Sequence, residues 1–234
     1  MKKIIVLLLL LTINTQAQLG KSLFTKDPIL NLENFDKQKM YWGYYLGFSN
    51  FDFKTDFKTN TGAPVDVKGH TGFNVGLVGA LRLQEYIELR FEPGLYYASR
   101  TITYSQFTND RDGLREVKAT YIDFPLMLKF SSLRTGNVRP YLLGGLSSTL
   151  NLSSNSKSED GNEKQKFRVK PWTQNYTVGF GVDLYFEYFK FSPSIRGVFG
   201  LKNELIPDAD PNSPWTGNIE SLKTRAFLVN FTFH

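Results

Sequence analysis

The chain has 234 residues, a formal net charge of +6 and no cysteine. Without cysteine it cannot be a small secreted domain held together by disulfides, and without a clustered basic face or a base-reading motif its mild charge excludes a nucleic-acid-binding protein. Its mean hydropathy of −0.28 is typical of a soluble protein. A membrane β-barrel, however, exposes only alternate residues to lipid, so periodicity is the better guide to its class.

The first residues predict an export signal. Lys2 and Lys3 precede an apolar stretch over residues 4–13, and Ala17 ends a short cleavage motif with small residues. A transmembrane helix needs about 20 apolar residues, and this stretch is shorter. We therefore expect residues 1–17 to be a signal peptide that is removed after Ala17.

Residues 18–39 are expected to form a periplasmic N-terminal segment. Apolar side chains, among them Phe24 and Phe35, stand between polar ones in this segment. Such anchors suit docking on another protein or covering the periplasmic end of the fold that follows. A flexible tether is the alternative interpretation.

Residues 40–234 read as a succession of β-strands. The clearest case is residues 87–104, where apolar and charged residues alternate, so one face of the strand is apolar and the other charged. The apolar set is Ile87, Leu89, Phe91, Leu95 and Tyr97, and the charged set is Glu88, Arg90, Glu92 and Arg100. The same alternation recurs over residues 121–130, 175–185, 188–201 and 227–233, and more weakly over residues 72–82 and 139–153.

The first strand, over residues 42–58, is irregular. Its apolar residues occupy even positions up to Phe48 and odd positions from Phe51 onward. One extra residue in a strand shifts the phase in this way. We therefore predict a β-bulge near Ser49 and Asn50.

The connections between the eight predicted strands alternate in length. Short links occur at residues 83–86, 131–138 and 186–187, and long polar links at residues 59–71, 105–115, 154–171 and 202–221. Short turns lie in the periplasm and long loops outside in outer-membrane barrels. The chain is therefore predicted to be all-β: an eight-stranded antiparallel up-and-down transmembrane β-barrel over residues 40–234, in the cell outer membrane. A soluble lipocalin-like barrel, with the apolar parity turned inward, is the alternative.

Prolines and aromatic residues add two further expectations. Pro93, Pro125 and Pro193 each remove a ladder donor inside a strand, so bulges or local widening are expected there, whereas Pro140 can open a strand. Aromatic rings favour the headgroup level of a bilayer, which predicts two belts. The periplasmic belt would hold Trp42, Tyr86, Phe130, Tyr141, Tyr185, Phe186, Tyr188, Phe231 and Phe233, and the outer belt Phe57, Tyr104, Phe107, Trp172 and Phe199.

The charged side chains, which share one parity along the strands, are expected to point into the lumen and fill it. Eight strands enclose a bore just wide enough for side chains, so a diffusion pore is not expected. Buried charges are tolerated when they are paired, and the set contains equal numbers of acids and bases. We interpret it as a structural plug, with a proton relay or ligand site as the alternative. The predicted lumen network is Glu88, Arg90, Glu92, Asp123, Lys129, Asp183, Lys190 and Arg196.

No catalytic, cofactor or metal site is predicted. The two histidines, His70 and His234, stand in an outer loop and at the terminus, and neither has a serine or acid at strand spacing. Metal sites rich in His and Cys are disfavoured by the same shortage. Asp208 and Asp210 lack the glycine and distal glutamate of a calcium loop. A non-enzymatic protein without a cofactor is expected.

Several sequence blocks resemble the PorT/SprT family of Bacteroidetes. They follow one another over nearly the whole predicted mature chain. The blocks are NLENFD at 31–36, WGYYLGF at 42–48, FDFK at 51–54, LRFEPGL at 89–95, FPLMLKF at 124–130, RPYLLGG at 139–145, VGFGVD at 178–183 and FKFSPSI at 189–195. The resemblance implies an outer-membrane barrel required for type IX secretion, which exports proteins carrying a C-terminal sorting domain and supports motility in gliding species. It supplies no catalytic residues.

These observations lead to one functional hypothesis and two competitors. The hypothesis is a non-enzymatic barrel that supports type IX secretion, and in gliding species motility, through contacts with other secretion-system proteins in a lipopolysaccharide-containing outer membrane. The competitors are a general surface barrel for adhesion or envelope integrity, and a lipid-modifying barrel enzyme. The candidate partner contacts are Phe24, Phe35, Trp172 and Trp215. For Trp215, packing within its own loop is an equal alternative.

Overall fold

The computed structural model describes residues 29–58, 65–158, 161–164 and 166–234. The predicted signal peptide and Phe24 therefore lie outside the described residues. Within the described part, strands make up most of the chain, and no helix is long and apolar enough to cross a membrane.

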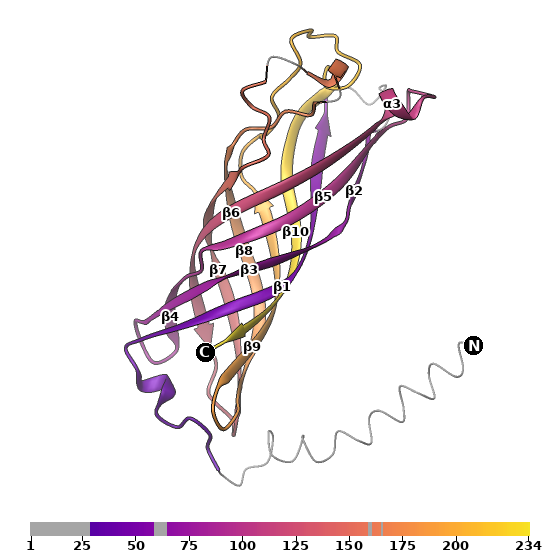
Figure 1. Ribbon diagram of the computed structural model, residues 1–234. Coiled ribbons are helices and arrows are strands. Elements are labelled where there is room, and N and C mark those ends of the chain that lie inside the picture. The colour runs from indigo at the N-terminus through magenta and orange to yellow at the C-terminus, as the bar shows by residue number, and fades with distance from the viewer. Residues whose placement is uncertain (1–28, 59–64, 159–160, 165) are drawn as a thin grey trace, which may run out of the picture.

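The strands form one closed antiparallel ring (Figure 1). They are β1 (Met40–Phe57), β2 (Val65–Gly69), β3 (Thr71–Arg82), β4 (Ile87–Phe91), β5 (Gly94–Tyr104), β6 (Leu114–Ser131), β7 (Val138–Asn151), β8 (Trp172–Tyr185), β9 (Lys190–Gly200) and β10 (Ile219–Phe233). β2 continues into β3 across His70, and β4 into β5 across Glu92 and Pro93, so the ten segments make eight barrel strands. β1 closes the ring by pairing with β10 and β3. This confirms the predicted all-β up-and-down barrel.

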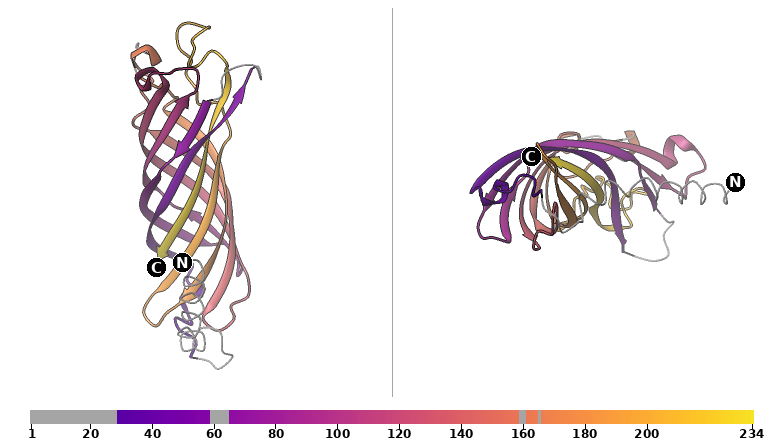
Figure 2. Two further views of the ribbon diagram at one scale, coloured as in Figure 1. Left: turned by 90° about the vertical axis from the view of Figure 1, so that its right-hand side faces the viewer. Right: turned by 90° about the horizontal axis from the view of Figure 1, so that it is seen from below.

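The connections follow the predicted alternation. Short turns over residues 83–86, 132–137 and 186–189 lie at one end, together with the described N-terminal residues and the C-terminus (Figure 2). Longer connections lie at the other end. They include a short helix, α3 (Asp110–Gly113), between β5 and β6, and a 3-10 turn, η2 (Asn162–Lys164), between β7 and β8.

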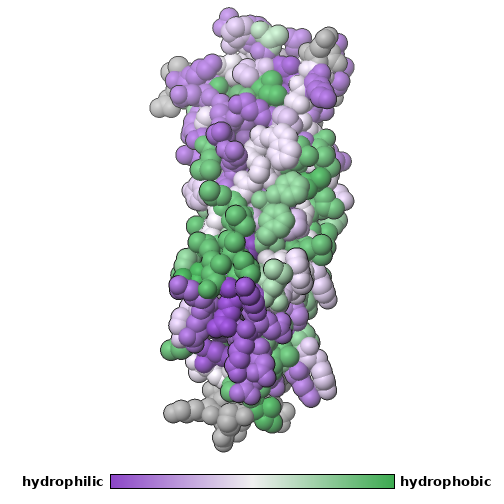
Figure 3. All heavy atoms as spheres, turned by 90° about the vertical axis from the view of Figure 1, so that its left-hand side faces the viewer, coloured by the Kyte–Doolittle hydropathy of each residue, from purple (hydrophilic) through white to green (hydrophobic). Residues whose placement is uncertain are grey.

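Large apolar side chains point outward over the middle of the barrel. Trp42 is 70% exposed, and Leu77, Leu126 and Phe180 are exposed with it. On the face shown in Figure 3, hydrophobic side chains gather over the middle of the barrel, between hydrophilic zones above and below them. The apolar parity therefore faces out over this band, contrary to the soluble lipocalin-like alternative.

The predicted bulge at Ser49 and Asn50 is wrong. β1 pairs in continuous register with both β10 and β3 through these residues, and its only register shift lies between Asp56 and Phe57. Odd-numbered side chains point inward from residue 41 to residue 53 without interruption. The apolar residues switch from even to odd positions because apolar side chains, among them Phe51 and Phe53, fill the lumen at this level, and not because the strand contains an extra residue.

Beyond the apolar band, the barrel has an apolar interior and a polar wall. Its core is Phe53, Ile102, Tyr104, Phe167, Val169, Leu205, Ile219 and Leu222. At this level the outward residues of β1 and β2 are polar, among them Asp52, Lys54 and Lys68. An apolar core behind a polar wall is the pattern of a barrel in water, so this end stands outside the bilayer.

The aromatic belts need correction for the same reason. Tyr104 lies in the outer apolar core, and Phe57 and Phe107 pack against it, so none of them joins the outer belt. Tyr141 and Tyr185 are buried in the lumen at the periplasmic end. Outward aromatic side chains that remain at the two edges of the band include Trp42, Tyr86 and Phe130 on one side and Phe73, Tyr97, Trp172 and Tyr176 on the other, whereas Tyr188 lies on the turn between β8 and β9.

Three of the four prolines lie at interruptions of the strand ladder. β6 pairs with β5 up to Asp123 and with β4 from Leu126, which leaves out Pro125 on that side. Pro93 separates β4 from β5, although its carbonyl still accepts a hydrogen bond from the Leu77 amide at 2.9 Å. The β8–β9 pairing stops at Ser194 and resumes at Phe191, leaving out Pro193. Proline has no amide hydrogen to donate, so the ladder must loosen at these points.

Candidate functional site

The candidate site is the periplasmic half of the lumen together with the segment that crosses its mouth. Charged residues enter the lumen because they occupy the inward positions of four strands. β4 and the residue after it supply Glu88, Arg90 and Glu92, β6 supplies Lys129, β8 supplies Asp183, and β9 supplies Lys190 and Arg196. All seven are at most 5% exposed.

Glu92 is held between two guanidinium groups. Arg90 Nε lies 2.8 Å from Glu92 Oε1, and Arg196 Nη1 lies 2.5 Å from Glu92 Oε2. A buried carboxylate is stable only when such partners replace its hydration. This group ties β9 to β4 across the bore.

Asp183 is the centre of a second group. Its carboxylate lies 2.6 Å from Lys129 Nζ and 4.0 Å from Lys190 Nζ, and it accepts a 2.6 Å hydrogen bond from Ser192. Lys129 also approaches Glu88 at 3.5 Å. Three strands are therefore linked through one carboxylate.

Asp123 stands apart from both groups. In the part of the chain that the structure describes, no basic side chain forms an ion pair with it. It accepts a 2.5 Å hydrogen bond from Thr149, which in turn accepts one from Asn175 at 2.8 Å. The three residues line an internal cavity of about 20 Å³, which has room for about one water molecule.

The prediction from sequence missed several lumen tyrosines. Tyr41 donates a 2.5 Å hydrogen bond to Glu88, and the Tyr45 and Tyr96 hydroxyls are 3.1 Å apart. The Tyr141 ring lies beneath the Lys129 ammonium at 4.4 Å. Strand parity is the signal that identifies them, since Tyr141 shares its parity with the inward Arg139.

Side chains fill the bore from end to end. The two ion-paired groups occupy the periplasmic half, the tyrosine pair and an amide pair between Asn74 and Asn230 (2.8 Å) lie further along, and the apolar core closes the outer end. An eight-stranded barrel encloses just enough space for such a filling.

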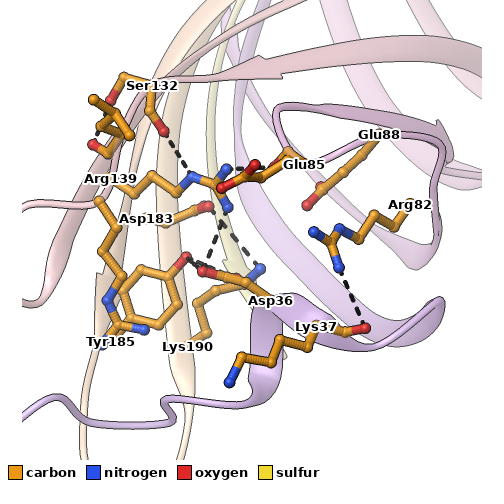
Figure 4. Close-up of polar contacts among 12 residues, drawn as sticks. Asp36, Lys37, Arg82, Glu85, Glu88, Ser132, Arg139, Asp183, Tyr185 and Lys190 are labelled. Carbon is orange, nitrogen blue, oxygen red and sulfur yellow. Dashed lines mark hydrogen bonds and ion pairs between the residues drawn. The ribbon is translucent and has the colours of Figure 1, made fainter.

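Residues 29–39 cross the periplasmic mouth (Figure 4). The Asp36 carboxylate accepts hydrogen bonds of 2.7 and 2.8 Å from the Tyr185 hydroxyl and lies 3.4 Å from Arg139 Nη1. Arg139 also donates to the carbonyls of Ser132 and Glu85, so it joins the segment to two periplasmic turns.

Phe35 packs over the last residues of the barrel. Its ring centroid lies 5.0 Å from that of Tyr41 and 6.3 Å from that of His234, and the Lys190 ammonium lies 4.5 Å above it. Burial, reinforced by the nearby Lys190 charge, lowers the pKa of His234 to about 2, so its ring is neutral and suited to this apolar contact. Phe35 is thus engaged within its own chain.

Upstream, Asn31 extends the contact to the β6–β7 turn. Its backbone amide donates to Asn137 Oδ1 at 2.9 Å, and its side chain donates to the Tyr185 carbonyl at 3.0 Å. Arg134 donates to the Asn31 carbonyl at 2.5 Å. The described part of the N-terminal segment therefore covers the mouth, one of the two roles expected for it.

Replacing Asp36 with alanine is expected to release this segment without unfolding the barrel. Hydrogen bonds to a charged group contribute about 1.5–3 kcal/mol, so local opening should become roughly ten- to a hundredfold more frequent. Trypsin cleavage after Lys37 and Lys39 in detergent micelles measures the opening. Glu33→Ala is the matched control, since Glu33 is exposed on the same segment. Equal cleavage of Asp36→Ala and wild type would contradict the prediction.

At the outer end, Asp208 joins two loops. It accepts hydrogen bonds from the Asn162 amide (3.1 Å), the Ser213 hydroxyl (2.6 Å) and the Thr216 hydroxyl (3.1 Å). Burial opposes ionisation, but these hydrogen bonds outweigh it and lower the pKa of Asp208. Asp208 therefore joins the described parts of the loops after β7 and β9.

The two candidate tryptophans differ in their surroundings. The Trp215 ring stacks on Phe107 with centroids 5.3 Å apart, and its indole nitrogen donates to the Asp112 carbonyl at 2.9 Å. This favours packing within the loops over partner contact. Trp172 points outward at the edge of the apolar band and is 55% exposed.

The histidines are not arranged for catalysis. His70 Nε2 lies 2.8 Å from the Thr101 hydroxyl on the outer wall, and His234 packs at the opposite end of the barrel. Among the described residues, no group of three or more His, Cys, Asp or Glu side chains is placed to hold a metal ion.

A closed antiparallel barrel with an apolar outer band and a charge-filled bore is an integral outer-membrane β-barrel. The chain belongs to the outer membrane protein beta-barrel domain family, whose model matches residues 16–205. The protein is accordingly located in the outer membrane. No curated protein matches the sequence significantly.

Several solved outer-membrane proteins are similar in fold. Neisserial surface protein A is 10% identical, with 83% of this chain and 98% of that chain covered and a TM-score of 0.44. OprG from Pseudomonas aeruginosa is 14% identical, with coverages of 82% and 95% and a TM-score of 0.43. AlkL is 17% identical, with coverages of 90% and 92% and a TM-score of 0.43.

Proposed function

We propose that this protein is a non-enzymatic outer-membrane barrel that supports type IX protein secretion, and motility in gliding species, through contacts with other proteins. The observation that carries the proposal is the filled bore: ion-paired charges occupy one half and an apolar core closes the other. A barrel filled in this way is not a conduit for cargo, so its action is expected at its two ends. The ordered blocks shared with the PorT/SprT family support the particular pathway.

The periplasmic end offers the better surface for such contacts. Ile29 and Tyr188 are each 84% exposed there, and Leu133 is 70% exposed on the turn between β6 and β7. Exposed apolar groups on a polar rim are typical of protein interfaces. The segment that covers the mouth contributes Ile29, so a secretion partner can engage the cover and the turns together.

Deletion of the gene tests the pathway. Loss of sorting-domain cargo from the medium, restored by the wild-type copy, is the expected result, and normal export from the deletion strain would overturn the proposal. A photo-crosslinking residue at Tyr188 should capture a secretion protein. The same residue at Leu142, which faces outward on β7, is the matched control and should capture none.

A second candidate, a surface barrel for adhesion or envelope integrity, is favoured by one observation. The barrel continues beyond the apolar band, and the described parts of its outer loops are joined through Asp208. This end of the barrel therefore presents a surface to the exterior. A deletion strain with normal export but weakened attachment or raised detergent sensitivity would favour this function over secretion.

A further inference from the structure

A groove opens on the outer wall where β8 begins. It has a volume of about 340 Å³. Its lining combines the ends of β7 and β8 with the loop after β9, and consists of Ser148, Lys170, Trp172, Thr173, Gln174, Lys202, Asn203 and Glu204. The Leu201 amide donates to the Gln174 carbonyl at 2.8 Å, so the loop is fixed against the barrel wall.

The groove lies at the level of the lipid headgroups. Trp172 marks the outer edge of the apolar band, and below it on β8 the exposed Tyr176 and Val178 face the hydrocarbon. Lys170 precedes Trp172 by two residues, which corresponds to about 7 Å along an extended chain. Interfacial tryptophan occupies the headgroup region, so the lysine reaches the depth of headgroup phosphates.

The groove is positively charged. Lys170 Nζ donates to the Asn203 carbonyl at 2.9 Å, which positions this ammonium and leaves two of its hydrogens for another acceptor. Lys202 is exposed beside it. The only acid in the lining is Glu204, which is 3% exposed and turns inward to accept hydrogen bonds from Thr224.

We propose that this groove binds the phosphate group of an outer-leaflet glycolipid. Two ammonium groups supply the charge, and Gln174 and Ser148 supply neutral donors beside an aromatic ring that contacts the sugar or acyl region. The location of the barrel in the outer membrane commits the site to a lipid source of phosphate. The proposal is independent of the secretion pathway, because it requires only that location.

A second groove at a similar level provides an internal comparison. It is lined by Phe73, Tyr97, Lys118 and neighbouring polar residues, so it also places a lysine above aromatic rings. Lys118, however, lies 3.3 Å from Glu116, and this carboxylate offsets its charge. Lys118→Gln is therefore the matched control for substitutions at Lys170 and Lys202.

The test uses the full mature barrel folded into phosphatidylcholine vesicles with or without bis-phosphorylated lipid A. Lipid retained on the barrel is measured by native mass spectrometry. Each basic side chain near an anionic headgroup contributes roughly a factor of five in binding, so Lys170→Gln with Lys202→Gln should weaken retention about thirtyfold. Lys118→Gln should retain lipid as wild type does. Lys202→Gln alone, which removes no structural hydrogen bond, should weaken retention about fivefold.

Two further arms identify the ligand. Dephosphorylated lipid A should not be retained, and inorganic phosphate added to the vesicles that contain lipid A should not compete with it for the barrel. The proposal is overturned if dephosphorylated lipid A is retained as well as lipid A, or if Lys118→Gln weakens lipid retention as much as the double variant does. It is also overturned if free phosphate displaces lipid A completely. Cargo export plays no part in these measurements, so their failure would leave the secretion proposal standing.

Discussion

Replacing Asp183 with asparagine is expected to lower the free energy of unfolding by about 3–5 kcal/mol, because it leaves buried cations without their shared counter-charge. Lys129 loses its 2.6 Å partner, and Lys190 loses the carboxylate 4.0 Å away. Both lysines are fully buried, so neither ammonium can recover hydration without opening the barrel. Glu88 remains 3.5 Å from Lys129, but one carboxylate cannot neutralise both.

Urea unfolding of the barrel in phospholipid vesicles, followed by tryptophan fluorescence, measures this loss. Asp52→Asn is the matched control. Asp52 pairs with Arg225 on the outer wall, where both side chains are partly exposed to water. A surface pair contributes less than about 1 kcal/mol, so this variant should unfold almost as wild type does. Similar losses of unfolding free energy in the two variants would show that the lumen charges do not stabilise the barrel.

Strand parity predicted the direction of most charged side chains, because alternation is a local property of extended backbone. Seven of the eight charges assigned to the lumen lie in its two ion-paired groups. Asp123 has the right parity but lies further along β6, beside a small internal cavity. The partner of a charge depends on the stagger between strands, which no single strand reveals.

Parity could not show where the bilayer ends. Phe51 and Phe53 are apolar, as are Leu46 and Phe48, but the first pair packs inside the barrel and the second faces lipid. The apolar residues changed parity because the barrel leaves the membrane, and a bulge was the wrong explanation. The inverse pattern on the wall, with Asp52 and Lys54 outward, is the sequence signal that distinguishes the two cases.

From the sequence, covering the periplasmic mouth was only one of several roles predicted for the segment that contains Phe35 and Asp36. Phe35 and Asp36 are an ordinary apolar and acidic pair in sequence. The partners of Asp36, Tyr185 and Arg139, lie more than 100 residues away, and so do His234 and Lys190, which contact Phe35. The separation leaves no local pattern, so only the closed barrel shows that these groups meet.

Replacing Gly94 with valine is expected to prevent correct closure of the barrel. Gly94 points into the lumen, and a Cβ atom there would collide with the Tyr45 hydroxyl and come within 2.9 Å of the Val75 carbonyl oxygen. Tyr45 is fully buried and its hydroxyl lies 3.1 Å from that of Tyr96, so it has no space to retreat. Such overpacking costs about 3 kcal/mol or more where backbone is also involved.

Folding of this variant is measured by heat-modifiable gel mobility after refolding into vesicles, with a large fall in the folded fraction expected. Gly144→Val is the matched control, because a Cβ on Gly144 meets no atom within 4 Å. Removing the obstacle with Tyr45→Ala should restore part of the folding of Gly94→Val, since residues in contact have coupled energies. Normal folding of Gly94→Val alone would mean that Tyr45 can leave the lumen, and the bore would then be less firmly filled than its contacts indicate.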